Sequence, residues 1–114
     1  MRLFTKPPAV MVLCAALSLS APLASAAGDA RAGEAKAKEV CQACHGMDGN
    51  SAVADYPKIG GQYPDYLSKA LRDYKSGARK NPIMAGFAGT LSKQDVDNVV
   101  AYYSSQPPAV VTKH

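Results

Sequence analysis

Cys41-Gln42-Ala43-Cys44-His45 forms a C-x-x-C-H motif in this sequence of 114 residues. Two thiols at this spacing can add to the two vinyl groups of one porphyrin, and the imidazole of the next residue then lies where it can bind the iron. We therefore expect one covalently bound haem c. Cys41 and Cys44 would carry its two thioether bonds, and His45 would be the first axial ligand of the iron.

Three other kinds of site use the same residue types. A thioredoxin-like redox pair expects a βαβ setting, and this sequence shows no alternation of strand and helix patterns. A structural zinc site takes four ligands, and the fourth would have to be the remote His114. A disulfide between Cys41 and Cys44 would close a very small ring. The adjacent histidine and an N-terminal export signal both favour haem.

The N-terminal segment has the order of a secretory signal peptide. A basic start is followed by an apolar run over residues 9–17 and by small residues at Ala24 and Ala26. Signal peptidase requires small side chains at the first and third positions before the cut. We therefore expect residues 1–26 to be removed by cleavage after Ala26, and residues 27–114 to form one domain in the periplasm.

The same segment bears on membrane and nucleic-acid binding. A membrane span needs about 20 apolar residues, and Ser18, Ser20 and Pro22 interrupt this run. We therefore expect no stable membrane anchor after cleavage. Arg2 and Lys6 leave with the segment, which lowers the formal charge of +4 by two. The remaining domain is near neutral and lacks the basic excess typical of nucleic-acid binding.

Local signals predict an all-α fold with three main helices. Asp29 is a suitable N-cap for a first helix that runs toward Cys44. A second helix begins at Pro64 and ends at Gly77. Ser92 opens a third helix with a capping box, and a pair of prolines stops it. Each of the last two carries an apolar stripe at helical spacing.

Long loops connect the predicted helices. Residues 46–62 and 78–90 are rich in Gly, Pro and other turn formers, and we expect both stretches to be irregular. Loops of this length in a small domain bury too little apolar surface unless they wrap a group that completes the core. We therefore expect them to wrap the haem. Gly33, in the first helix, indicates that another helix approaches closely.

The second axial ligand of the iron has three candidates. Met47 stands two residues after His45 and cannot reach the opposite face of the ring. His114 lies at a chain end, where fraying is common. Met84 lies far along the chain among Pro and Gly residues, and we expect its thioether to be the ligand. Ordinary core packing is the alternative role for Met84.

Several groups of residues match one known family. They are residues 41–46 and 48–50 (CQACHG and DGN), 56–62 (YPKIGGQ), 76–79 and 81–84 (SGAR and NPIM), and 91–92 with 101–103 (LS and AYY). The sequence thereby resembles the class I c-type cytochromes, especially the bacterial periplasmic branch that includes cytochromes c-four and c-five. The resemblance covers nearly all of residues 27–114 and implies the cytochrome c fold.

The resemblance also implies individual roles. The backbone carbonyl of Pro57 would accept a hydrogen bond from His45 and orient its ring. Gly33 and Tyr102 would mark the crossing of the first and last helices. The sequence departs from cytochrome c-four in having one C-x-x-C-H motif and not two, so it resembles a single half of that protein.

A histidine–methionine iron site favours electron transfer over catalysis. Both axial positions are filled, so no position remains for oxygen, peroxide or substrate. We expect a periplasmic carrier, not an enzyme, that passes single electrons between redox proteins such as a membrane cytochrome complex, a terminal oxidase or a periplasmic reductase. The alternatives are a haem c subunit of a periplasmic oxidoreductase complex and, more distantly, a five-coordinate gas-binding or peroxidatic protein.

Five basic residues crowd one stretch of the sequence: Lys69, Arg72, Lys75, Arg79 and Lys80. They would either steer an acidic redox partner or form the solvated face of an amphipathic helix. Arg79 has a further alternative role, which is to hold a haem propionate.

Overall fold

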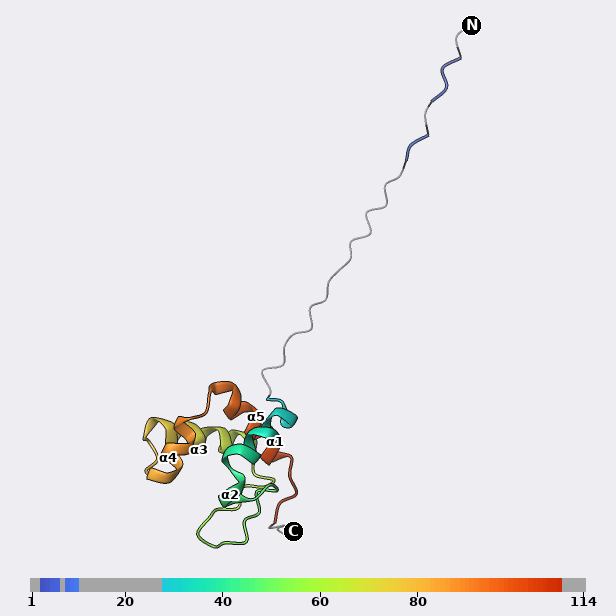
Figure 1. Cartoon of the computed structure of the whole chain (residues 1–114). Helices are drawn as coiled ribbons and strands as arrows, with labels where there is room; N and C mark the ends of the chain where they lie inside the picture. Colours follow the sequence, from blue (N-terminus) through green and yellow to red (C-terminus); the bar gives the residue numbers. More distant parts are fainter. Residues whose placement is uncertain (1–2, 7, 11–27, 110–114) are drawn as a thin grey trace.

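The computed structural model describes residues 3–6, 8–10 and 28–109, and all regular structure within these ranges is helical (Figure 1). The helices are α1 (Ala30–Val40), α2 (Gln42–His45), α3 (Pro64–Ser76), α4 (Pro82–Gly89) and α5 (Lys93–Ser104). The predicted cleavage site after Ala26 and the residue His114 lie outside the described residues. Among the helices described, none has the length and apolar character needed to cross a membrane.

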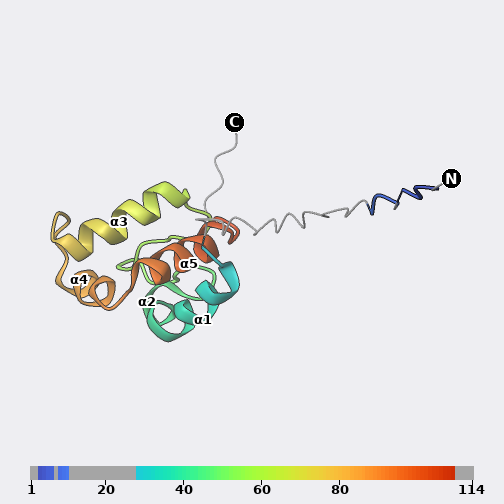
Figure 2. The same cartoon turned by 90° about the horizontal axis from the view of Figure 1, so that it is seen from above.

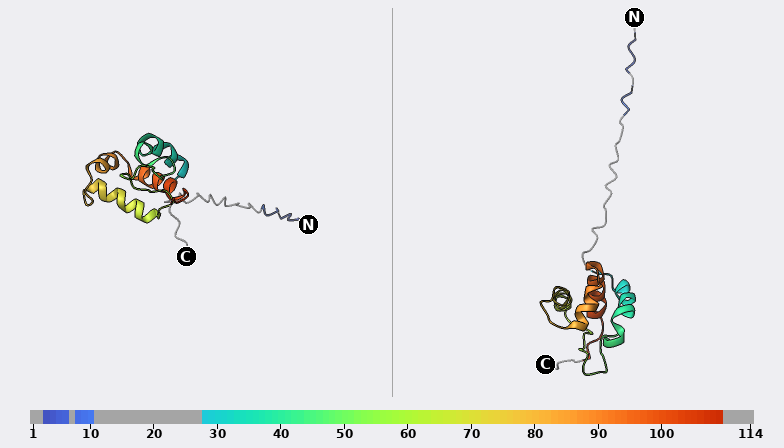
Figure 3. Two further views of the ribbon diagram at one scale, coloured as in Figure 1. Left: turned by 90° about the horizontal axis from the view of Figure 1, so that it is seen from below. Right: turned by 60° about the vertical axis from the view of Figure 1, so that its left-hand side comes forward.

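Helix α5 lies between α1 on one side and the pair α3 and α4 on the other (Figures 2 and 3). The N-termini of α1 and α5 are formed as predicted. Asp29 accepts hydrogen bonds from the amides of Arg31 and Ala32, and Ser92 forms a reciprocal capping box with Asp95. These bonds satisfy amides that the first turn of a helix leaves without partners.

The crossing of α1 and α5 is tight at Gly33. A Cβ atom built on this glycine would lie 1.9 Å from the carbonyl oxygen of Asn98 and 2.9 Å from the Cβ of Tyr102. Only a residue without a side chain allows the two backbones to approach so closely. The expected close approach at Gly33 is confirmed, and the carbonyl of Asn98 is a nearer neighbour than the expected Tyr102.

The predicted first helix is interrupted before it reaches Cys44. Helix α1 ends at Val40, and Cys41 has a φ of −106° and a ψ of −32°. The amides of Cys44 and His45 both donate to the Cys41 carbonyl, which starts α2 as a separate turn. Cys41 therefore lies at the break between the two helices, and Cys44 and His45 lie in the short helix that follows it.

The prediction of an irregular loop over residues 78–90 is wrong, because α4 occupies most of it. The side chain of Asn81 accepts hydrogen bonds from the amides of Ile83 and Met84, both at 3.0 Å. Pro82 occupies the first turn, where its missing N–H costs nothing. Helix-start chemistry at these two positions, together with packing of α4 against α3, outweighs the helix-weakening glycines.

The other expectations about connections are confirmed. Residues 46–62 contain no helix, and α3 begins at Pro64 and is capped by Gly77. Gly77 has a φ of 82°, a left-handed conformation that glycine adopts without strain.

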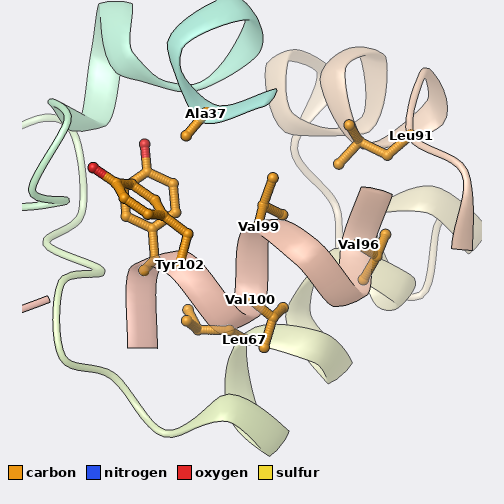
Figure 4. Packing of buried hydrophobic residues seen from close by; sticks show 8 residues of the cluster. Ala37, Leu67, Leu91, Val96, Val99, Val100 and Tyr102 are labelled. Carbon is orange, nitrogen blue, oxygen red and sulfur yellow. The ribbon is translucent and has the colours of Figure 1, made fainter. Parts of the chain in front are cut away.

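Helix α5 supplies most of the hydrophobic core (Figure 4). Ala37 from α1 and Leu67 from α3 approach α5 from two sides, close to Val99 and Val100. Burying a leucine or valine side chain stabilises the fold by about 1.5–3 kcal/mol. The core thus holds α1 and α3 at fixed positions on either side of α5.

Candidate functional site

A hollow of about 280 Å³ lies between α2, α3, α4 and α5. Every site residue predicted from the sequence lines it: Cys41, Cys44, His45, Pro57, Arg79 and Met84. These residues come from four separate stretches of the chain, and the fold brings all of them to one place.

His45 is held with one ring nitrogen free. Its side chain is buried, and its Nδ1 lies 2.8 Å from the carbonyl oxygen of Pro57. Because a carbonyl can only accept a hydrogen bond, Nδ1 carries the proton and donates it. In the neutral ring with this tautomer, the other nitrogen, Nε2, carries the lone pair that a metal ligand requires.

The two cysteines stand beside His45 at the hollow. Both are partly buried, and both thiols are free. Burial raises the pKa of the Cys41 thiol to about 11. Cys41 is therefore protonated at neutral pH.

Met84 reaches the hollow from α4. Its side chain is partly buried, and its backbone amide is bound by Asn81 in the cap of this helix. Met47 does not line the hollow, and it packs instead against the hydrophobic core. Of these two methionines, the structure brings Met84 together with His45.

The walls of the hollow are mainly apolar. Helix α3 contributes the stripe that the sequence predicts, including Leu71 and Tyr74, and α4 contributes Ile83 and Phe87. The last two are 63% and 44% exposed. Sequence reasoning missed their role because it placed them in a loop, although the helix cap at Asn81 was visible.

The five basic residues do not form one free patch. Lys69 forms an ion pair with Asp73, one helical turn along α3. The ammonium of Lys75 donates to the carbonyl of Leu91. The guanidinium of Arg79 lies 4.7 Å from the centre of the Tyr74 ring.

Comparison with known proteins identifies the family. Residues 28–102 match the family model described as cytochrome C oxidase, cbb3-type, subunit III. Cytochrome c-554(548) of Halomonas halodenitrificans is 43% identical over 83 residues, which cover 70% of this chain and 99% of that protein. This chain belongs to the class I c-type cytochromes. The fold is accordingly the all-α cytochrome c fold.

This cytochrome is also similar to cytochromes c4. That of Pseudomonas aeruginosa is 50% identical over 88 residues, which cover 77% of this chain and 43% of the relative. The crystal structure of reduced recombinant cytochrome c4 from Pseudomonas stutzeri matches with a TM-score of 0.68 and 45% identity, over 74% of this chain and 48% of that one. The chain thus spans about half the length of the cytochromes c4 that it matches.

Haem c is the covalently bound cofactor of this family, and the residues at the hollow fit it. Cys41 and Cys44 are both free thiols at the C-x-x-C-H spacing. The donor set adds one imidazole with an unprotonated Nε2 and one thioether, which are iron ligands in cytochromes c. The apolar walls suit a flat, hydrophobic ring.

Proposed function

We propose that this cytochrome carries single electrons between redox partners in the periplasm. Cys41 and Cys44 would attach the haem, and His45 and Met84 would bind its iron. One observation carries the proposal: two cysteines and an imidazole from one segment and a thioether from a distant segment all line one apolar hollow.

Some residues of this chain orient the His45 ring, and others form the apolar walls around the hollow. The hydrogen bond to Pro57 keeps the His45 ring in one tautomer and one direction, which preserves its ligand geometry when the charge changes. The apolar walls would shield the bound group from water and favour the less charged, reduced state. Haem iron supplies a reversible one-electron change when bound. With His45 and Met84 both serving as ligands, the site would leave no position for a substrate.

Export and partners complete the proposal. A signal peptide over residues 1–26 would be cleaved after Ala26, leaving the cytochrome domain at residues 27–114. Its partners would be redox proteins such as a membrane cytochrome complex, a terminal oxidase or a periplasmic reductase. A relative from Stutzerimonas stutzeri named as a thiosulfate dehydrogenase electron acceptor supports a role between redox proteins.

The basic residues of α3 and of the turn after it support electrostatic steering of acidic partners. Of the five, Lys69 is paired with a carboxylate, whereas the ammonium of Lys75 keeps its charge when it donates to a carbonyl, so most of the positive charge remains for long-range attraction. We expect the rate of reduction by an acidic partner to fall as ionic strength rises.

Arg79 would hold a haem propionate. Its guanidinium lines the hollow, stacks on Tyr74 and lies 3.5 Å from the hydroxyl of Tyr66. A planar guanidinium held in this way can present paired N–H donors to a carboxylate.

A haem c subunit of a periplasmic oxidoreductase complex is the second candidate function. A relative from Chlorobaculum tepidum is named as the cytochrome subunit of sulfide dehydrogenase, which favours this reading. Size-exclusion chromatography of native material separates the two. A carrier elutes at the mass of one small domain, whereas a subunit elutes with its complex.

Visible spectroscopy of the exported protein tests the proposed function. We expect a sharp α band in the ferrous protein and a weak far-red band from the methionine ligand in the ferric protein. Met84→Ala should abolish the far-red band and let the ferrous protein bind carbon monoxide. Met47→Ala, the matched control, should change neither property. A far-red band that survives Met84→Ala would refute the assignment of this ligand.

A further inference from the structure

The hydroxyl of Tyr103 lies beside the end of α2, the helix that carries His45. It donates a hydrogen bond to the carbonyl of Gly46 at 3.0 Å, one residue after His45. Gly46 ends α2 as its C-cap. The phenol, 3% exposed and lining the hollow, therefore bonds to the residue that ends the helix carrying the histidine.

The backbone of Tyr103 reaches a third part of the site. Its carbonyl accepts a hydrogen bond from the amide of Gly61 at 2.9 Å. Gly61 lies four residues after Pro57, whose carbonyl holds the ring of His45. Tyr103 thus contacts both the backbone that follows His45 and the loop that holds its imidazole.

Gly46 has particular need of this restraint. Its φ is 78° and its ψ is 163°, a conformation that only glycine adopts readily. A glycine carries no side chain that could fix the following peptide plane by packing. The hydrogen bond from Tyr103 supplies that restraint, and it is formed in a partly buried setting, where an unpaired carbonyl costs free energy.

We propose that Tyr103 is a positioning residue for His45, fixing the backbone after the histidine through its hydroxyl and the Pro57 loop through its carbonyl. The inference rests on the proposed function, since it assigns Tyr103 a role toward the iron ligand. The bond from the Tyr103 hydroxyl to Gly46 is the contact on which the role depends.

Tyr102 provides a matched control. Its hydroxyl donates to the next carbonyl along the chain, that of Met47, at 2.7 Å. Tyr102 is buried as well, but it lies against Gly33 in the helix crossing and does not line the hollow. Replacement of either tyrosine by phenylalanine removes the same kind of bond, and only Tyr103 has a direct link to the loop of Pro57.

Proton exchange at the His45 ring tests the proposal in the haem-loaded protein. The Nδ1 proton, which is bonded to Pro57, is followed by NMR in the reduced state. Tyr103→Phe should accelerate its exchange about fivefold, the effect of losing one buried hydrogen bond. Tyr102→Phe should change the rate less than about twofold, although both variants lose similar stability to denaturant. Equal acceleration in the two variants, or none in Tyr103→Phe, would overturn the proposal.

If the Tyr103→Phe variant does not fold, a second measurement on the unaltered protein tests the same proposal. In the unaltered haem protein, the His45 ring proton and the Gly61 amide should exchange with the same denaturant dependence, because one opening releases both. Different dependences would overturn the proposal. A colourless unaltered protein would overturn the proposed function together with this inference, whereas a coloured protein with equivalent phenylalanine variants would remove only the role of Tyr103.

Discussion

Two sides of α5 are built in different ways. On one side, α1 crosses so closely that the site of a Cβ on Gly33 falls 1.9 Å from the carbonyl of Asn98. On the other side, α3 and α4 line a hollow of about 280 Å³ together with α5. In α5 six residues are buried, whereas in α4 only Ala88 is.

The α1–α5 crossing is packed by protein atoms alone, whereas the α3–α4 side lines a hollow that suits a cofactor. Protein atoms fill the α1–α5 crossing, so its stability depends on backbone approach and helix caps. The α3–α4 side instead presents apolar side chains to a hollow, and these gain stability only when an apolar group covers them. Changes to one side should therefore leave the other largely intact.

Loss of haem attachment should have the largest effect, and it should be confined to one side. In Cys41→Ser combined with Cys44→Ser, we expect amide exchange to accelerate throughout α3 and α4, by about a hundredfold or more. The α1–α5 crossing should accelerate far less. Hydrogen exchange with mass spectrometry measures both. Equal acceleration on the two sides would show that the crossing also depends on the haem.

Gly33→Ala should damage the crossing. The new Cβ would meet a carbonyl oxygen of α5, so the two helices must separate, at a cost of about 3 kcal/mol in the free energy of unfolding. Gly86→Ala in α4 is the matched control, since a Cβ there meets nothing within 4 Å. It should stabilise the protein by up to about 1 kcal/mol through helix propensity. Denaturant unfolding of the haem protein compares them, and similar losses would contradict the account of the crossing.

Asn98 should contribute less than Gly33. Its Oδ1 accepts hydrogen bonds from the amide of Asp29 at 2.8 Å and from Gln94 at 2.9 Å. Asn98→Ala leaves the Asp29 amide without its partner, and we expect a loss of about 1–2 kcal/mol. Gln94→Ala removes only the second bond and should cost under about 0.5 kcal/mol. If both variants unfold at the same denaturant concentration, the hydrogen bond between the Asp29 amide and Asn98 does not contribute to stability.

The capping box of α5 should give the smallest effect, which is present at neutral pH and lost in acid. Hydrogen bonds from Ser92 lower the pKa of the Asp95 carboxyl below its usual 3.8. A lowered pKa in the folded state means that the carboxylate stabilises the fold above this value and that the contribution is lost as the pH falls through the folded pKa. Asp95→Asn should therefore flatten the decline in stability below about pH 4. In a Ser92→Ala background the same substitution should have much less effect.

The sequence predicted the parts of this structure that depend on local chemistry. The caps at Asp29 and Ser92, the start at Pro64 and the stop at Gly77 all appear where they were expected. These signals act over a few residues, and tertiary packing does not override them here. The C-x-x-C-H motif similarly predicted which residues line the hollow.

Two features escaped prediction because they depend on tertiary contacts. Helix α4 contains Gly86 and Gly89, which read as loop formers, and packing on α3 is what outweighs them. The sequence placed Tyr103 in the apolar stripe of the last helix, and the resemblance placed Tyr102 at the helix crossing, so neither hydroxyl had an expected partner. Their hydrogen bonds reach carbonyls more than fifty residues away, and no local pattern predicts such a pairing.

Peptide mass spectrometry of the exported protein tests the central claim most directly. After proteolysis, we expect the peptide that contains Cys41, Cys44 and His45 to carry the mass of one haem, with neither cysteine open to alkylation. An unmodified peptide from folded protein, with both cysteines alkylated, would contradict the account.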